Sequence, residues 1–592
     1  MRLGKHDFPL THSRSLRYVA RCQTRSIKGQ KYHDPYSEEG LRNSVPGIDP
    51  LLDEVKKSWH RPEPDADSLL RNILRYGDEL PARCTDGDYF MILRQALEEL
   101  KPDQLIIPLT NGHALKHKDF PRSTSPGYPW SFNFKTKGQV IDDPLAPNYI
   151  HRAWDSIGRG VPWQLNPAEA FHRTVASEQT KNKVRLTWGY PIDVVAEEAR
   201  WFLPLFATLK KDANRKDFFY GLGLETALGG QTHIRGHFDR APPGSKVLNG
   251  DLSEFDQHVT DWIIRDVFAI LKTWFDFTKV VDSEGIVWNV NPAQSERRWN
   301  AMVSYFIKTK IRLPQGAVIQ KFQGVPSGSM WTNLMDTIVN CVQMRTICRR
   351  MGLPIYKDYY YGDDSSIIII PTPGEGNPID LDEFSAQLKK TFGGILSVAK
   401  TGIYDQPDGI HWLGYWSRPG NAVARDIFFL IASNFFPERE VIDAVDASTR
   451  LLGQAYSTMS AEDSIPFLRA ITWLSIKYKF TISDVHNRIR ELGPKRFKYL
   501  STLGIDFADF RIPKVVPDRY CRFGARCDAV TPQYQQTPTV QHGNRVDDWE
   551  KRRFRPFRPP NFSLAPSSDV HLPPELLTTS YLRQYTYSEA PF

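Results

Sequence analysis

The sequence predicts a protein that mixes helices and strands, and three observations support this prediction. Residues 359–361 and 365–370 are rich in aromatic and β-branched side chains, which favour strands. Residues 259–274 repeat apolar side chains at helical spacing, and residues 437–500 also have a helical pattern. Between about residue 40 and residue 435 both kinds of segment occur without low-complexity sequence or a clean linker.

Length and composition are those of a large globular protein. The 592 residues can bury sizeable cores, and 41% hydrophobic and 24% charged residues are ordinary values. The formal net charge of +8 permits a polyanionic partner without requiring one. The six cysteines lack zinc-site spacing, and a cysteine-poor chain fits a reducing compartment. No run approaches the roughly 20 apolar residues of a membrane span, and no signal-peptide pattern begins the chain. We therefore expect a soluble intracellular protein without a membrane partner.

The two ends of the chain differ from the middle in composition. The first 30 residues carry seven basic residues against the single acid Asp7, a pattern typical of a solvated arm that can also contact phosphates. After about residue 512, prolines and the basic patch KRRFRPFRPP (551–560) predict an extended tail that lies over the surface.

The stretch YYYGDDSSIIII, residues 359–370, places two adjacent acids at a predicted hairpin turn. Gly362 and Asp363 suit a tight turn between strands, and an ordinary Gly-Asp turn would explain these two residues alone. Asp364 is the reason for a second interpretation, because two carboxylates backed by apolar strands repel each other unless a cation lies between them. The stretch therefore indicates a cation site, for which a third carboxylate is expected elsewhere.

The stretch NGDLSEFDQHV, residues 249–259, supplies further acids. Val247 and Leu248 predict a strand that ends near Asp251. Asp256 lies near the start of the next predicted helix, where the helix dipole favours an acid in any case. Taken alone, Asp251 would be interpreted as an ordinary loop acid.

Three further segments carry weaker signals. GVPSGSMWTNLMDTIVN (324–340) predicts a small-residue loop that presents backbone N–H groups, followed by a helix. KNKVRLTWGYP (181–191) places Lys181, Lys183 and Arg185 at alternate positions, so a strand would present them on one face. A solvated strand face explains that row equally well. RSTSPGYPW (122–130) predicts a loop of small and aromatic residues.

Taken in order, these segments resemble the motif series of viral RNA-directed RNA polymerases over roughly residues 120–420. STSPGYPW resembles the template-channel loop, motif G, and KNKVRL resembles the basic motif F. DLSEFD, SGSMWT and YGDD resemble motifs A, B and C. FGGILSVAKT (392–401) resembles motif D, and IHWLGYW (410–416) resembles the motif E hairpin. The sequences of these motifs are most similar to those of the polymerases of partitiviruses, which have segmented double-stranded RNA genomes. They are next most similar to those of picobirnavirus polymerases.

One position departs from many positive-strand members of that family. They carry asparagine four residues after the motif B threonine, where this chain has Asp336. Partitivirus-like enzymes are similar to this chain in that respect. If Asp256 and Asp336 both approach the incoming sugar, a shared proton or a bridging hydroxyl would let the two acids coexist.

The resemblance implies an α+β fold shaped as a cupped right hand. The expected parts are a basic N-terminal arm (1–40), fingers with motifs G and F (41–240, joined by 275–322), a palm with motifs A to E built on an antiparallel sheet (241–424), a helical thumb (425–512) and a Pro/Arg-rich C-terminal extension (513–592).

The resemblance also implies an RNA-directed RNA polymerase that replicates and transcribes a double-stranded RNA genome by two-metal nucleotidyl transfer. Hard oxygen ligands would select two Mg²⁺ or Mn²⁺ ions. The expected catalytic residues are Asp251, Asp363 and Asp364, which also hold the metal ions, and Lys400 as a general acid. The expected nucleotide-binding residues are Lys183, Arg185, Asp256, Ser327, Gly328, Thr332 and Asp336, and the expected RNA-binding residues are Ser125, Gly127, Lys181 and Trp412.

The expected partners are template and product RNA, NTPs and a viral capsid protein, with the virion interior or host cytoplasm as location. Two alternatives stay open. A reverse transcriptase also carries paired acids on a palm hairpin, but it typically has a bulky residue where this chain has Asp256. A non-catalytic RNA-binding virion protein would fit the charge, but it leaves the acids at 251, 363 and 364 unexplained.

Overall fold

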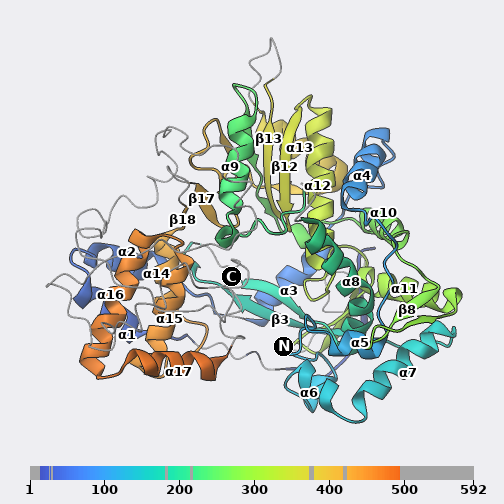
Figure 1. Ribbon diagram of the computed structural model, residues 1–592, viewed down its shortest axis with the longest axis horizontal. Helices are drawn as coiled ribbons and strands as arrows, with labels where there is room; N and C mark the ends of the chain where they lie inside the picture. Colours follow the sequence, from blue (N-terminus) through green and yellow to red (C-terminus); the bar gives the residue numbers. More distant parts are fainter. Residues whose placement is uncertain are drawn as a thin grey trace.

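The computed structural model describes residues 14–25, 27, 31–63, 65–180, 184–213, 218–371, 379–417 and 423–493. The expected C-terminal extension lies outside these residues, as do residues 1–13, 26 and 28–30 of the expected N-terminal arm and residues 494–512 of the expected thumb. In Figure 1 the described elements form three groups: a sheet with its helices at the top, a second sheet with helices at the lower right, and a helical group at the lower left.

The upper group is built on an antiparallel sheet of four strands, in the order β12 (Ile355–Tyr361), β13 (Asp364–Ile369), β6 (Lys246–Asn249) and β15 (Gly402–Tyr404). This is the predicted palm, and the predicted hairpin is present between β12 and β13. Gly362 takes a positive φ of 62° in the turn, as expected for a two-residue connection.

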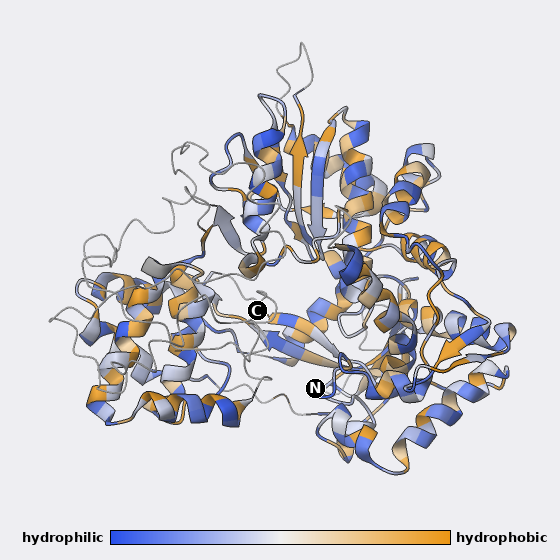
Figure 2. Ribbon diagram, viewed as in Figure 1, coloured by the Kyte–Doolittle hydropathy of each residue, from blue (hydrophilic) through white to orange (hydrophobic). Residues whose placement is uncertain are grey.

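Both faces of this sheet are buried, which explains its unbroken runs of aromatic and β-branched residues. Alternate side chains point to opposite faces of a strand. Tyr359 and Ile368 pack with Ile234 of α9 (Gly230–Arg240), whereas Tyr360 and Ile367 join the main core. That core also contains α10 (Asp261–Lys272), α12 (Thr332–Arg350) and α13 (Leu381–Phe392). In Figure 2 β13 is coloured as hydrophobic along its isoleucines, whereas β12 beside it is mixed.

The group at the lower right corresponds to the predicted fingers. Its sheet has the order β1 (Leu16–Arg21), β11 (Ala317–Lys321), β10 (Lys310–Arg312), β3 (Ala168–Thr174) and β5 (Val184–Gly189), with β10 and β3 parallel. Strands β10 and β11, from the segment after motif A, thus complete a sheet whose other strands precede it in the chain. The accompanying helices are α3 (Ala66–Leu74), α5 (Asn111–Lys116), α6 (Lys137–Asp142), α7 (Ala146–Gly158), α8 (Ile192–Ala213) and α11 (Pro292–Ile307). Helix α4 (Gly87–Leu100) lies instead beside α12 of the upper group (Figure 1), where Arg345 of α12 forms an ion pair with Glu99 of α4.

The helical group at the lower left is the predicted thumb. It consists of α14 (Ile427–Phe435), α15 (Ala444–Ser457), α16 (Ala461–Tyr478) and α17 (Ile482–Leu492). Ser460 is the N-cap of α16, and α17 begins with a capping box at Thr481 and has Gly493 as its C-cap. One boundary differs from the expected fingers: α1 (Pro35–Ser44) and α2 (Asp49–Ser58) share a hydrophobic core with these thumb helices.

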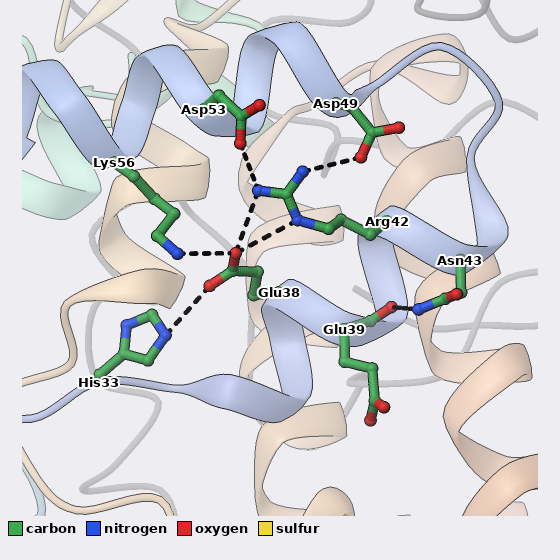
Figure 3. A network of polar contacts seen from close by, with 8 residues as sticks. All are labelled: His33, Glu38, Glu39, Arg42, Asn43, Asp49, Asp53 and Lys56. Atoms are coloured by element: carbon green, nitrogen blue, oxygen red, sulfur yellow. Dashed lines mark hydrogen bonds and ion pairs between the residues drawn. The ribbon is translucent and has the colours of Figure 1, made fainter.

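Ion pairs cross-link α1 and α2 on their outer side (Figure 3). Arg42 donates to Glu38 at 3.1 Å and to Asp49 at 2.8 Å, and Lys56 reaches the same Glu38 at 3.0 Å. Such partly exposed pairs contribute little individually, so the apolar contacts of α1 and α2 with the thumb decide their position.

Short elements complete the description. They are β2 (Trp59–His60), β4 (Ser177–Glu178), β7 (Leu252–Ser253), β8 (Lys279–Val281), β9 (Val287–Asn289), β14 (Ile395–Leu396), β16 (His411–Trp412), β17 (Tyr415–Ser417), β18 (Val423–Ala424) and the 3₁₀ turns η1 (Arg75–Gly77), η2 (Trp130–Phe132), η3 (Thr226–Leu228) and η4 (Phe255–Gln257). Among the described helices, none is long and apolar enough to cross a membrane.

Candidate active site

Strand pairing brings the predicted acids of motifs A and C together. Ile367 pairs with Leu248 in the antiparallel β13–β6 ladder. The same register, continued to the strand ends, places Asp364 opposite Asp251. Two bonds fix the strands at this end: the Gly250 N–H donates to Ser365 Oγ at 3.2 Å, and Asn249 Nδ2 donates to the Ser365 carbonyl at 3.0 Å.

The ionised forms of the two acids at the hairpin are disfavoured by their surroundings. The pKa of Asp364 is raised to about 7, mainly by burial and then by the charges of Asp363 and Asp251, while Arg185 opposes this shift. Asp363 reaches water, yet surrounding protein atoms desolvate it and raise its pKa, with a smaller contribution from Asp251. Repulsion of this kind is relieved when a cation joins the group.

Asp251 is paired with Lys400 in this structure. Lys400 Nζ lies 3.1 Å from Asp251 Oδ2, and both side chains are about half exposed. The Asp251 carbonyl also accepts from the Ser397 N–H at 2.8 Å, so motif D is tied directly to motif A. Among the described residues, no three acid, histidine or cysteine side chains are gathered tightly enough to hold a metal ion as they stand.

Side chains of helix α12 form hydrogen bonds with the backbone of the turn that carries Asp363, and the sequence alone did not reveal these contacts. Asn340 Nδ2 donates to the carbonyls of Gly362 and Asp363 at 3.1 and 3.0 Å. The Gly362 N–H donates to Thr337 Oγ1 at 2.8 Å. Both side chains are fully buried. The helical spacing of the sequence placed Asn340 near Asp336 on the helix, but no local signal pointed to its contact with the turn.

Asp256 and Asp336 form a second acidic pair beside the turn. Burial raises the pKa of Asp256 to about 7, with Asp363 adding to the shift. Burial also raises the pKa of Asp336, and the charge of Asp256 adds to it. Asp336 Oδ1 and Ser327 Oγ are buried without a hydrogen-bond partner among the described residues. These two oxygen atoms are available for hydrogen bonds with polar atoms of a ligand.

A buried lysine that sequence reasoning missed lies near this pair. Lys321 is fully buried, and its Nζ donates to the carbonyls of Phe306 at 2.7 Å, Ile307 at 3.1 Å and Gly324 at 2.7 Å. Burial lowers its pKa, and the charge of Asp256 opposes that shift. Lys321 thereby joins the end of α11 to the start of the motif B loop.

The motif B loop is closed on itself and packed against motif F. Thr332 Oγ1 donates to the carbonyls of Pro326 at 2.7 Å and Ser329 at 2.9 Å, so this hydroxyl is occupied by the loop. A Cβ on Gly328 would lie only 2.4 Å from the Trp188 carbonyl of β5. Glycine at this position therefore permits a close approach of two backbones.

Replacing Gly328 by alanine is expected to displace the loop and to cost about 1–3 kcal/mol of stability, because the clash is with backbone. Thermal unfolding and nucleotide incorporation would both be measured. Gly112→Ala is the matched control, since a Cβ there meets nothing within 4 Å. Equal behaviour of the two variants would contradict the close approach.

Of the predicted basic row, Arg185 lies in the described part of the chain. It is exposed on β5, and its charge lowers the pKa values of Asp256, Asp363 and Asp364, so it faces the acidic group. Lys181 and Lys183 lie outside the described residues.

The predicted RNA-binding residues have different surroundings. Ser125 is partly exposed, and Gly127 packs against the backbone of Tyr190 and Pro191. Trp412 requires a correction. Its side chain is 1% exposed and its indole N–H donates to the Leu224 carbonyl at 2.9 Å. A buried indole packs the β16–β17 hairpin and cannot stack on a base.

The fold and the site define a class of protein. An antiparallel palm sheet carries acids at a hairpin turn, a finger sheet presents a basic strand to them, and a helical thumb follows; together they form the right-hand polymerase fold. Residues 38–424 match the family described as viral RNA-dependent RNA polymerase, and the chain belongs to that family. The resemblance in the motifs is thereby confirmed.

Curated relatives include two RNA-directed RNA polymerases. One, from Cryptosporidium parvum virus 1, is 27% identical over 253 residues, which cover 42% of this chain and 43% of the relative. The other, from White clover cryptic virus 1, is 22% identical over 363 residues, which cover 58% of this chain and 55% of the relative. The chain thus spans about half the length of the curated relatives that it matches.

A similar fold occurs in a solved structure, the RNA-dependent RNA polymerase of a human picobirnavirus. The TM-score is 0.55 at 15% identity, over 76% of this chain and 85% of the other. This likeness confirms the predicted α+β right-hand fold.

Proposed function

We propose that this protein synthesises RNA on an RNA template, as the replicating and transcribing polymerase of a double-stranded RNA virus. Family membership supports this proposal. The observation that carries it is the register of β6 and β13, which leads Asp251 and Asp364 to the same edge of the palm sheet, beside Asp363.

The acids fit two divalent cations by their chemistry. Carboxylate oxygens are the ligands that Mg²⁺ and Mn²⁺ prefer. Burial, and after it the charges of neighbouring acids, raises the pKa values of Asp363 and Asp364, and a bound cation would offset both effects. Asp251 and Asp363 would be the principal ligands, with Asp364 in support. When bound, such ions would activate a 3′-hydroxyl and stabilise the leaving pyrophosphate.

Other side chains would position the nucleotide. Arg185 is exposed and faces the acids, so its guanidinium can bind triphosphate oxygens, with Lys183 as a second cation. The unpartnered Ser327 Oγ and Asp336 Oδ1, together with Asp256, would recognise the ribose 2′-hydroxyl. Thr332 would act by holding the loop closed.

The test is synthesis by purified protein given an RNA template, Mg²⁺ or Mn²⁺, and either NTPs or dNTPs. Product with NTPs supports the proposal. Product with dNTPs would favour a reverse transcriptase, and no product with either would favour a non-catalytic RNA-binding virion protein.

Lys400 is the proposed general acid for pyrophosphate release. Lys400→Met is expected to lower kcat by about a hundredfold, the lower end of the range typical of general acid catalysis, because the ammonium that faces Asp251 is lost. Lys400→Arg would retain the charge and part of the rate. Lys389→Met, at an exposed position of α13, is the control; a Lys400→Met rate equal to that of this control would contradict the assignment.

The remaining partners are also proposals. Template and product RNA would be held mainly through their phosphates, so binding should weaken as salt rises. Ser125 and Gly127 would lie along the template path. We further propose that the enzyme works with a viral capsid protein, inside the virion or in the host cytoplasm.

A further inference from the structure

An acid in the second turn of α8 binds the motif B loop. Glu198 is fully buried, yet it contacts no residue of the acidic group described above. Its Oε1 accepts from Ser329 Oγ at 2.7 Å, and its Oε2 accepts from the Met330 N–H at 2.9 Å. Ser329 Oγ in turn accepts from the Trp331 N–H at 3.1 Å. One carboxylate therefore fixes the last residues before α12.

The same carboxylate faces a second functional loop. Lys137, at the start of α6, is 6% exposed, and its Nζ donates to Thr124 Oγ1 at 2.8 Å and to the Ser125 carbonyl at 2.6 Å. Burial raises the pKa of Glu198 to about 7, whereas the hydrogen bonds from Ser329 and Met330 and, to a smaller extent, the positive charge of Lys137 favour the carboxylate. Lys137 thus binds the loop of residues 122–127, which resembles the template-channel loop, and its charge acts on Glu198.

The backbone connects the two loops to the same helix. The Ile192 N–H, at the first residue of α8, donates to the Pro126 carbonyl at 2.8 Å. Two turns further along α8, Glu198 binds Ser329. A movement of residues 122–127 would therefore be transmitted to the motif B loop through α8 and through the electrostatic interaction between Lys137 and Glu198.

We propose that Glu198 is a positioning residue for nucleotide selection. It sets the position of the loop that carries Ser327 and of the start of α12, which carries Asp336. Together with Lys137, it makes the position of the motif B loop depend on how the template binds at residues 122–127. This inference rests on the proposed polymerase function, but its structural half can be tested without activity.

The first experiment compares Glu198→Ala with Glu198→Gln by hydrogen exchange. Exchange of the Met330 and Trp331 amides is expected to rise about tenfold or more in Glu198→Ala, because the acceptor of the Met330 N–H is lost. Glutamine can accept from Met330 and donate to Ser329, so exchange should stay within about threefold of wild type. Unchanged exchange in Glu198→Ala would overturn the anchoring role, whether or not the protein polymerises.

The second experiment measures the steady-state kinetics of nucleotide incorporation by the Glu198 variants and by the wild-type protein in parallel. Glu198→Ala is expected to raise KM for NTP about tenfold and to lower NTP:dNTP selectivity, and Glu198→Gln should restore both. A residue that only stabilises the fold would reduce the active fraction, and hence apparent kcat, at unchanged KM and selectivity. That outcome would overturn the role in selection. Inactive wild type would instead contradict the proposed function.

A double-mutant cycle tests the link to the template loop. Lys137→Met and Ser329→Ala are each expected to lower kcat/KM for NTP. Their combined effect should fall short of the product of the single effects by about threefold or more, because both act through Glu198. Lys118→Met, at an exposed position, combined with Ser329→Ala is the matched control and should be multiplicative. Multiplicative effects in the Lys137 cycle would overturn the coupling.

Discussion

Asp363→Asn is expected to lower the rate of nucleotide incorporation by about a thousandfold or more, with the fold retained. Phosphoryl transfer depends on charge neutralisation and positioning, and single groups that supply these are worth on the order of a thousandfold or more. Asparagine keeps the size of the side chain but removes the negative charge that a divalent cation needs. The Asp363 carbonyl, which accepts from Asn340, is unaffected. Single-turnover incorporation on a primed RNA template would measure the effect.

Asp405→Asn is the matched control, because Asp405 is an exposed acid just after β15 on the same sheet. It should polymerise at the wild-type rate. A circular dichroism spectrum and melting temperature close to those of wild type would show that Asp363→Asn is folded. Robust synthesis by the folded Asp363→Asn protein would refute the assignment of the metal site.

Metal binding can be followed without activity. Mn²⁺ that binds the native state raises the melting temperature, and protons compete with it for carboxylates. Because the pKa of Asp364 is raised to about 7, this acid is mostly protonated at pH 6 and mostly ionised at pH 8. The stabilisation by Mn²⁺ should therefore grow from pH 6 to pH 8 in wild type. It should be largely lost in Asp363→Asn, and an equal shift in both proteins would place the ion elsewhere.

Asp256→Ala is expected to reduce the preference for NTPs over dNTPs by about a hundredfold. A site that hydrogen-bonds a substrate hydroxyl can reject the analogue that lacks it by several orders of magnitude, since its buried polar groups are then left unpaired. Asp256 is coupled by charge to Asp336, whose Oδ1 has no partner among the described residues. Competition between a labelled NTP and the matching dNTP would measure the ratio.

Asp336→Asn provides the comparison for this test. It removes one charge from the pair but keeps a hydrogen-bonding side chain, so sugar preference should be kept better than in Asp256→Ala. If Asp256→Ala leaves the NTP:dNTP ratio unchanged, Asp256 does not recognise the 2′-hydroxyl. A wild-type preference for dNTPs would favour the reverse transcriptase alternative.

The sequence by itself determined the palm hairpin, because its signals are local. The turn needs a residue that tolerates positive φ, which Gly362 supplies, and the aromatic and β-branched residues on either side of it favour strands, so both signals lie within a dozen consecutive residues. The sequence also contained motifs A, B and C in the expected order, and this order predicted the family. The motif E hairpin was expected from the resemblance of residues 410–416, and its turn contains Leu413 and Gly414, both with positive φ.

The tertiary structure decided which distant side chains support the site. Asn340 reaches the Asp363 turn, Lys321 joins α11 to the motif B loop, and Glu198 reaches Ser329 across 131 residues. Trp412 is buried rather than exposed, and α1 and α2 join the thumb rather than the fingers. The physical reason is that burial and pairing of polar groups depend on contacts between segments far apart in the chain, which periodicity and turn chemistry do not encode.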